Sequence, residues 1–162
     1  MQALIIDRQA ARLDHCQIAL MNAGVQVTGT GSLLVAETCI TRMGVDLLVI
    51  EKTTIGDALG DTLGMAEDRN PNLVAILRTP DVADDQDSLS PHFPSLHCVV
   101  GQDVSNEVAI KLGLASLRAQ ATRSVMPARA VRLAPKTVKA MPVPAAYAAG
   151  AAVADNIFSE VM

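Results

Sequence analysis

The sequence predicts an α/β fold in which a doubly wound, five-stranded parallel sheet carries helices on both faces. Five short apolar runs alternate with helix-like segments over the first 117 residues, and this alternation is typical of successive βα units. The third run, Leu47 to Ile50, is apolar at every position, as expected for a strand buried on both faces. The chain has 162 residues, half of them hydrophobic, which suits one good core and is too short for two ordinary domains.

The first elements follow from local signals. The expected strands are residues 3–6, 25–28, 47–50, 73–77 and 97–100. A first helix at 9–23 ends before Gly24, a residue suited to the position after a helix C-terminus. A second helix follows Ser32, a preferred N-cap residue, and ends before Gly44.

The later helices are less regular. Residues 54–70 carry a glycine at every fourth position, and each glycine inside a helix costs about 1 kcal/mol relative to alanine. We expect a weak, fraying helix there; the alternative is a smooth face against which another backbone packs closely. Residues 80–96 hold four aspartates and three prolines, so we expect a loop with at most one helical turn, and thus a fourth helix that is short or missing. The last helix is expected to reach about Leu117.

A C-terminal extension follows the sheet. We expect the folded domain at 1–120, a basic linker rich in Pro and Ala at 121–144, and an amphipathic helix at 145–162. Fifteen acids against six bases give −9 up to Glu107, whereas seven bases and no acid give +7 over residues 108–154. The helix carries an apolar stripe that we expect to bind a partner protein, formed by Val153, Ile157, Phe158 and Val161.

Composition also narrows the classes of function. Aromatic residues make up only 2%, which argues against platforms for stacking nucleic-acid bases. The three cysteines and three histidines show no metal-ligand spacing, so we expect no metal and no other cofactor. Unpaired cysteines, the absence of a signal-peptide pattern and the absence of a bilayer-spanning segment together favour the cytoplasm, with no membrane partner.

Polar residues stand where the apolar runs end. Asp7 and Arg8 follow the first strand, Glu51 the third, Thr79 the fourth and Gly101 the fifth. The carboxyl ends of the strands of such a sheet form one edge, where ligands bind. The open question is whether Glu51 is a working acid, a substitute for another residue, or an exposed strand end.

These strand ends resemble the response-regulator receiver domain, the phosphoacceptor module of two-component signalling. The resemblance covers roughly residues 1–117 and rests on the segments LIIDR, DLLVIE, AILRT and CVVGQ. It implies the strand order 2-1-3-4-5 and a phosphoacceptor site at the strand tips. Asp7 and Thr79 agree with that site, but Arg8 replaces a second acid, Glu51 the phosphorylated aspartate, and Gly101 a lysine.

These departures imply a degenerate receiver that performs no phosphoryl transfer, since such catalysis depends on Mg²⁺ and a positioned cation. We expect the Arg8 guanidinium to take the ion's place between Asp7 and Glu51. The alternative is that Arg8 points to solvent and Glu51 is exposed.

The leading hypothesis is a non-phosphorylated, receiver-like signalling module, not an enzyme, in bacterial two-component or related regulation. It would act by binding a signalling protein or a second copy of itself. One alternative is a flavodoxin-like ligand-binding protein or enzyme that uses Asp7, Glu51 and Thr79, although no glycine-rich phosphate loop is present. Another is a regulator that contacts nucleic acid through the basic extension, although no helix-turn-helix follows the sheet.

Overall fold

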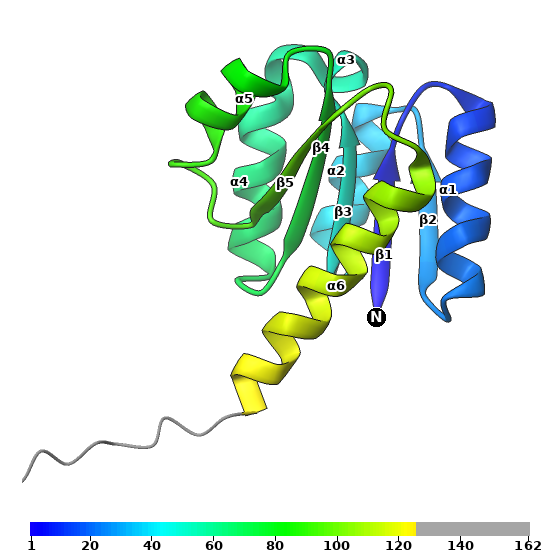
Figure 1. Ribbon diagram of the computed structural model, residues 1–162, viewed down its shortest axis with the longest axis vertical. Coiled ribbons are helices and arrows are strands. Elements are labelled where there is room, and N and C mark those ends of the chain that lie inside the picture. Colours follow the sequence, from blue (N-terminus) through cyan, green and yellow to red (C-terminus); the bar gives the residue numbers. More distant parts are fainter. Residues whose placement is uncertain (126–162) are drawn as a thin grey trace, which may run out of the picture. The chain divides into compact units, whose positions relative to one another are not determined.

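The computed structural model describes residues 1–125 and confirms the predicted fold class (Figure 1). The strands form one parallel sheet in the order β2-β1-β3-β4-β5. In chain order the elements are β1 (Gln2–Ile6), α1 (Ala10–Asn22), β2 (Gln26–Thr30), α2 (Leu33–Arg42), β3 (Leu47–Glu51), α3 (Lys52–Ile55), the 3₁₀ turn η1 (Gly56–Ala58), α4 (Leu59–Arg69), β4 (Val74–Thr79), α5 (Val82–Leu89), β5 (Leu96–Gly101) and α6 (Asn106–Val125).

Two apolar layers enclose the sheet, because side chains of a strand alternate between its faces. On β3, Leu47 and Val49 pack with residues of α1 and α6, whereas Leu48 and Ile50 pack with residues of α2, α4 and α5. All five residues of β3 are buried. This two-sided burial explains why the central strands read as continuous apolar runs.

The segment after β3 is not one fraying helix. Gly56 has a φ of 57°, a conformation that side chains disfavour, and it separates the single turn of α3 from the regular helix α4. A Cβ on Gly60 would lie 3.7 Å from Phe93 Cζ, and one on Gly64 would meet nothing within 4 Å. Among the described residues no backbone packs closely against these two glycines, so the alternative of a smooth packing face was wrong, and the expected helix over residues 54–70 is interrupted at Gly56.

Residues 82–89 form an eight-residue helix, α5. The fourth helix is therefore short, as expected, but the prediction of at most one turn was wrong. Asp81 is the N-cap, and its side chain accepts a hydrogen bond from the backbone N–H of Asp84 at 3.4 Å. Asp84 and Asp85 lie in the first turn, where the helix dipole favours negative charge. The aspartates thus start a helix, and Pro80 and Pro91 lie outside it.

The last helix was predicted too short. α6 continues past Leu117 to Val125 and so includes the first residues of the expected linker. The remaining linker residues, 126–144, and the expected helix at 145–162 lie outside the described residues. Within residues 1–125, no helix is both long and apolar enough to cross a membrane.

Two helical glycines provide a test of how α6 packs on the sheet. A Cβ on Gly113 would approach Ile76 Cδ1 at 2.7 Å and Leu47 Cδ1 at 2.8 Å. Gly113→Ala is therefore expected to lower the free energy of unfolding by about 1–3 kcal/mol through overpacking. Gly64→Ala, which meets open space in α4, is expected to raise it by about 0.5–1 kcal/mol. Urea denaturation of both variants measures these changes. Equal changes in the free energy of unfolding would contradict the close packing of Gly113 against the sheet.

Candidate functional site

Asp7 and Glu51 lie on the same side of the sheet at its carboxyl edge. This edge of the sheet is the upper one in Figure 1. Glu51 continues the alternation of Leu47 and Val49, which face α1 and α6, and Asp7 continues that of Ile5. Both carboxylates are buried, with exposed fractions of 4% for Asp7 and 1% for Glu51. Buried carboxylates require compensating partners.

Arg12, in the first turn of α1, joins the two carboxylates. Its Nε donates to Asp7 Oδ2 and its Nη2 donates to Asp7 Oδ1 at 3.0 Å. The same Nη2 lies 3.2 Å from Glu51 Oε2. The hydrogen bond to Asp7 raises the pKa of the Arg12 guanidinium above its ordinary value, despite burial, so Arg12 remains charged.

Arg78 supplies a second buried cation from β4. Glu51 and Arg78 are partners in the register of β3 and β4, so their side chains leave the sheet on the same face. Arg78 is 3% exposed, and its Nε lies 3.9 Å from Glu51 Oε2. Its other nitrogens donate to Asn106 Oδ1 and to the backbone oxygens of Gln102, at 3.1 Å, and Val104, at 2.7 Å. Arg78 therefore holds the loop before α6 as well as Glu51.

The second oxygen of Glu51 has neutral partners. Gln102 Nε2 donates to Oε1 at 2.8 Å and Thr53 Oγ1 donates to it at 3.2 Å. Glu51 Oε2 and Arg78 Nε make no hydrogen bond among the described residues, so at this point the two groups interact by charge alone. Two acids and two arginines, Asp7, Arg12, Glu51 and Arg78, thus form a neutral cluster that we call the strand-tip network.

The structure corrects the role predicted for Arg8. Arg8 is exposed, and among the described residues only its backbone N–H is engaged, donating to Thr54 Oγ1 at 3.1 Å. A guanidinium does lie between Asp7 and Glu51, but it comes from Arg12, four residues further along the chain. Glu51 is buried, so the alternative of an exposed strand end was wrong for that residue and right for Arg8.

Thr79 belongs to a separate group. Its hydroxyl donates to Asp85 Oδ2 and accepts a hydrogen bond from the backbone N–H of Asp81. Lys52 Nζ pairs with the other oxygen of Asp85 at 2.5 Å. In the described part of the chain, no hydrogen bond or ion pair joins Thr79 to Asp7 or Glu51, so Thr79 lies in a different cluster from these two acids.

Gly101 ends β5 and supplies no cation. A Cβ at this position would approach Asp103 Oδ1 at 2.4 Å, so a side chain at 101 requires Asp103 to move. The positive charge near Glu51 comes instead from Arg12 and Arg78, from two other elements.

Sequence reasoning missed Arg12, Arg78 and Asn106, although signals for the two arginines were present. Arg78 is the one charged residue of β4, a fully buried strand with four apolar residues before it, and ionised groups are rare at buried positions unless paired. Arg12 lies in the first turn of a helix that begins at the carboxyl edge. Asn106 links the two, since it accepts from Arg78 and donates to the Arg12 backbone oxygen at 3.5 Å; no sequence signal identifies it.

The strand-tip network does not fit a magnesium ion. Mg²⁺ requires several hard oxygen ligands in octahedral geometry, but Arg12 binds both oxygens of Asp7 and pairs with Glu51 Oε2. Residues 1–125 contain no group of three or more His, Cys, Asp or Glu side chains that could hold a metal ion. A carboxylate bound by arginines is also poorly placed to act as a nucleophile or base.

Comparison with solved structures confirms the resemblance at the level of fold. A response-regulator receiver domain from Methanospirillum hungatei is 16% identical with a TM-score of 0.65, over 75% of this chain and 97% of that one. A receiver protein from Sinorhizobium medicae is 18% identical with a TM-score of 0.63, over 74% and 96%. The signal receiver domain of an HD domain-containing protein from Pseudomonas fluorescens is 14% identical with a TM-score of 0.63, over 78% and 93%. No protein-family model and no curated protein matches the sequence.

Proposed function

We propose that this protein is a receiver-fold signalling module that acts through protein–protein contacts and accepts no phosphoryl group. The observation that carries the proposal is the position of Arg12, whose guanidinium binds Asp7 and pairs with Glu51. In the receiver family, as the resemblance implies, a metal ion and a phosphorylated aspartate occupy this place. The Arg12 guanidinium is part of the chain, so it takes this place permanently, whereas a metal ion or a phosphoryl group can bind and leave.

The chemistry of phosphoryl transfer supports this proposal. Transfer depends on positioning and on neutralising the charge of the phosphoryl oxygens with Mg²⁺ and cationic side chains. Glu51 is 1% exposed and its carboxylate is engaged by Arg12, Gln102 and Thr53. Phosphorylation would require breaking these contacts and burying a further negative charge.

We propose two surfaces for partner proteins. We propose that the apolar stripe of Val153, Ile157, Phe158 and Val161 contacts a signalling protein as a helix, since a helix of this length is marginal in water unless its apolar face is buried. The second proposed surface is that of α5, the helix of the fourth βα unit.

Incubation of the full chain with acetyl phosphate and Mg²⁺ is expected to leave its intact mass unchanged. The physical reason is that Glu51 is buried and bound, and that Gly101 provides no lysine. Intact-mass spectrometry over several hours, with an active receiver domain as positive control, is the measurement. A stable gain of one phosphoryl group on Glu51 would overturn the proposal.

A further inference from the structure

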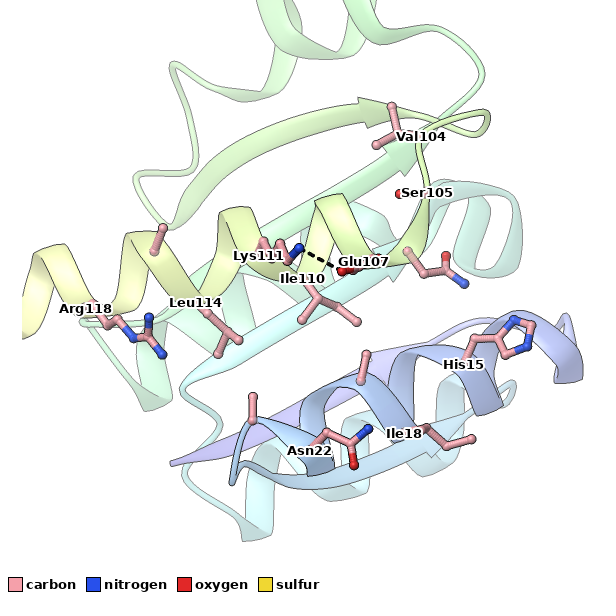
Figure 2. A pocket seen from close by; sticks show the side chains of 14 residues that line it. His15, Ile18, Asn22, Val104, Ser105, Glu107, Ile110, Lys111, Leu114 and Arg118 are labelled. Carbon is pink, nitrogen blue, oxygen red and sulfur yellow. Dashed lines mark hydrogen bonds and ion pairs between the residues drawn. The ribbon is translucent and has the colours of Figure 1, made fainter.

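A groove of about 1010 Å³ runs between α1 and α6, on the face of the sheet opposite α5 (Figure 2). Figure 2 shows Ile110 and Leu114 pointing from α6 toward α1. Ile110 and Leu114 are buried, whereas Ile18 on the α1 wall is 56% exposed. An exposed branched aliphatic side chain beside an apolar floor is typical of a surface that binds an apolar partner.

We propose that the α1–α6 groove is the docking site of this chain's own C-terminal segment, residues 145–162, bound as a helix. The inference rests on the proposed function only in taking that segment as a docking helix. It adds the site on which the segment docks and the regulation that follows.

The chain length outside the described residues permits this docking within one molecule. α6 ends at Val125, and Arg118, at one end of the groove, lies seven residues earlier in the same helix, about 10 Å along its axis. The far end of the groove, near Asn106, is about 28 Å from Val125. The 19 residues 126–144 can span at most about 63 Å, so the segment can reach the groove in either direction.

The two surfaces match in length and in chemistry. The groove follows α6 from Asn106 to Arg118, about 18 Å, and a helix from Val153 to Val161 is about 12 Å long. The apolar stripe would meet the floor formed by Ile110 and Leu114.

Charge favours the same pairing. Arg118 is exposed at the groove and takes part in no ion pair among the described residues, whereas Lys111 is paired with Glu107 at 2.7 Å. The segment carries two acids, Asp155 and Glu160, and no base. On a helix Glu160 flanks the apolar stripe, so its pairing with Arg118 at the edge of the groove would add electrostatic complementarity.

Docking in this groove would place the segment against Asn106, which lines the groove and hydrogen-bonds to two residues of the strand-tip network, the Arg78 side chain and the Arg12 backbone. A partner that binds the apolar stripe would have to displace the segment from the groove. The segment thus acts as a built-in competitor for its own partner, present at millimolar effective concentration.

The test is a titration of a labelled peptide of residues 145–162, followed by fluorescence anisotropy. The peptide is expected to bind the full chain carrying Ile157→Asp and Phe158→Asp at least tenfold more tightly than it binds wild type, because the wild-type segment already occupies the groove. Equal binding to both proteins, or binding to neither, would overturn the proposal.

A matched pair of substitutions locates the peptide. In the Ile157→Asp, Phe158→Asp background, Ile18→Asp at the groove is expected to weaken peptide binding at least tenfold. Leu34→Asp, which changes an exposed side chain on α2, is expected to leave it unchanged. If Ile18→Asp has no effect, the groove is not the site.

Sedimentation distinguishes docking within one chain from docking between two copies. Wild type is expected to sediment as a monomer. A dimer that the Ile157→Asp, Phe158→Asp variant does not form would assign the groove to a second copy and overturn docking within one chain. A phosphoryl gain on Glu51 would overturn the proposed function but leave this titration unchanged.

Discussion

Replacing Arg78 with leucine is expected to lower the free energy of unfolding by about 3–5 kcal/mol at pH 7, the cost of removing one partner of a buried ion pair. The substitution leaves Glu51 with one cation, Arg12, instead of two. It also leaves the backbone oxygens of Gln102 and Val104 without their side-chain donor. Urea denaturation, monitored by far-ultraviolet circular dichroism, measures the loss.

Arg8 provides the matched control for Arg78, since Arg8→Leu removes the same charge from an exposed position. It is expected to change stability by no more than about 0.5 kcal/mol. A double variant, Glu51→Leu with Arg78→Leu, tests the pairing itself. Its loss should be smaller than the sum of the two single losses by about 1 kcal/mol or more, because no buried charge then lacks its partner. If Arg78→Leu costs no more than Arg8→Leu, the strand-tip network does not stabilise the fold.

The fold was predictable because buried strands require apolar residues, and these runs are visible in the sequence. A strand such as β3, covered on both faces, must be apolar at successive positions, and Leu47 to Ile50 show this directly. The position of Glu51 at the carboxyl edge followed from the same pattern. The length of α5 did not, because aspartates and prolines occur both in loops and at helix starts. The structure identifies Asp81 as the N-cap through the hydrogen bond that its side chain accepts from the backbone N–H of Asp84.

The sequence predicted that a guanidinium lies between Asp7 and Glu51, but it did not predict which arginine provides it. The resemblance places a metal ion between Asp7 and Glu51, which is why a guanidinium was expected to take that place. Which arginine supplies it depends on the direction of the side chain, and the sequence does not record that direction. Arg8 follows Asp7 immediately, so on extended backbone the two alternate in direction. Arg12 lies in the first turn of α1, and its long side chain reaches back to both carboxylates.

Variants of Arg8 and Arg12 test which of the two arginines prevents Mg²⁺ from binding beside Asp7 and Glu51. Arg8→Asp restores the second acid of the receiver family, but we expect it to bind no Mg²⁺, because the Arg12 guanidinium still binds Asp7 and pairs with Glu51. Arg8→Asp combined with Arg12→Ala removes that cation and leaves three carboxylates at one edge. We expect this double variant to gain Mg²⁺ affinity, since hard oxygen ligands with uncompensated charge favour the ion.

The measurement is the stability of each variant with and without 10 mM Mg²⁺ at constant ionic strength; for a dissociation constant of about 1 mM, this concentration is about ten times that constant. Binding at that ratio stabilises the folded state by about 1.4 kcal/mol. Arg8→Asp with Arg42→Ala is the matched control, because it has the same net charge but removes an exposed arginine of α2. Only the variant that lacks Arg12 should be stabilised by Mg²⁺. If Arg8→Asp alone is stabilised equally by Mg²⁺, Arg12 does not occupy the place of the metal ion. The proposal that this internal cation prevents phosphoryl transfer would then be wrong.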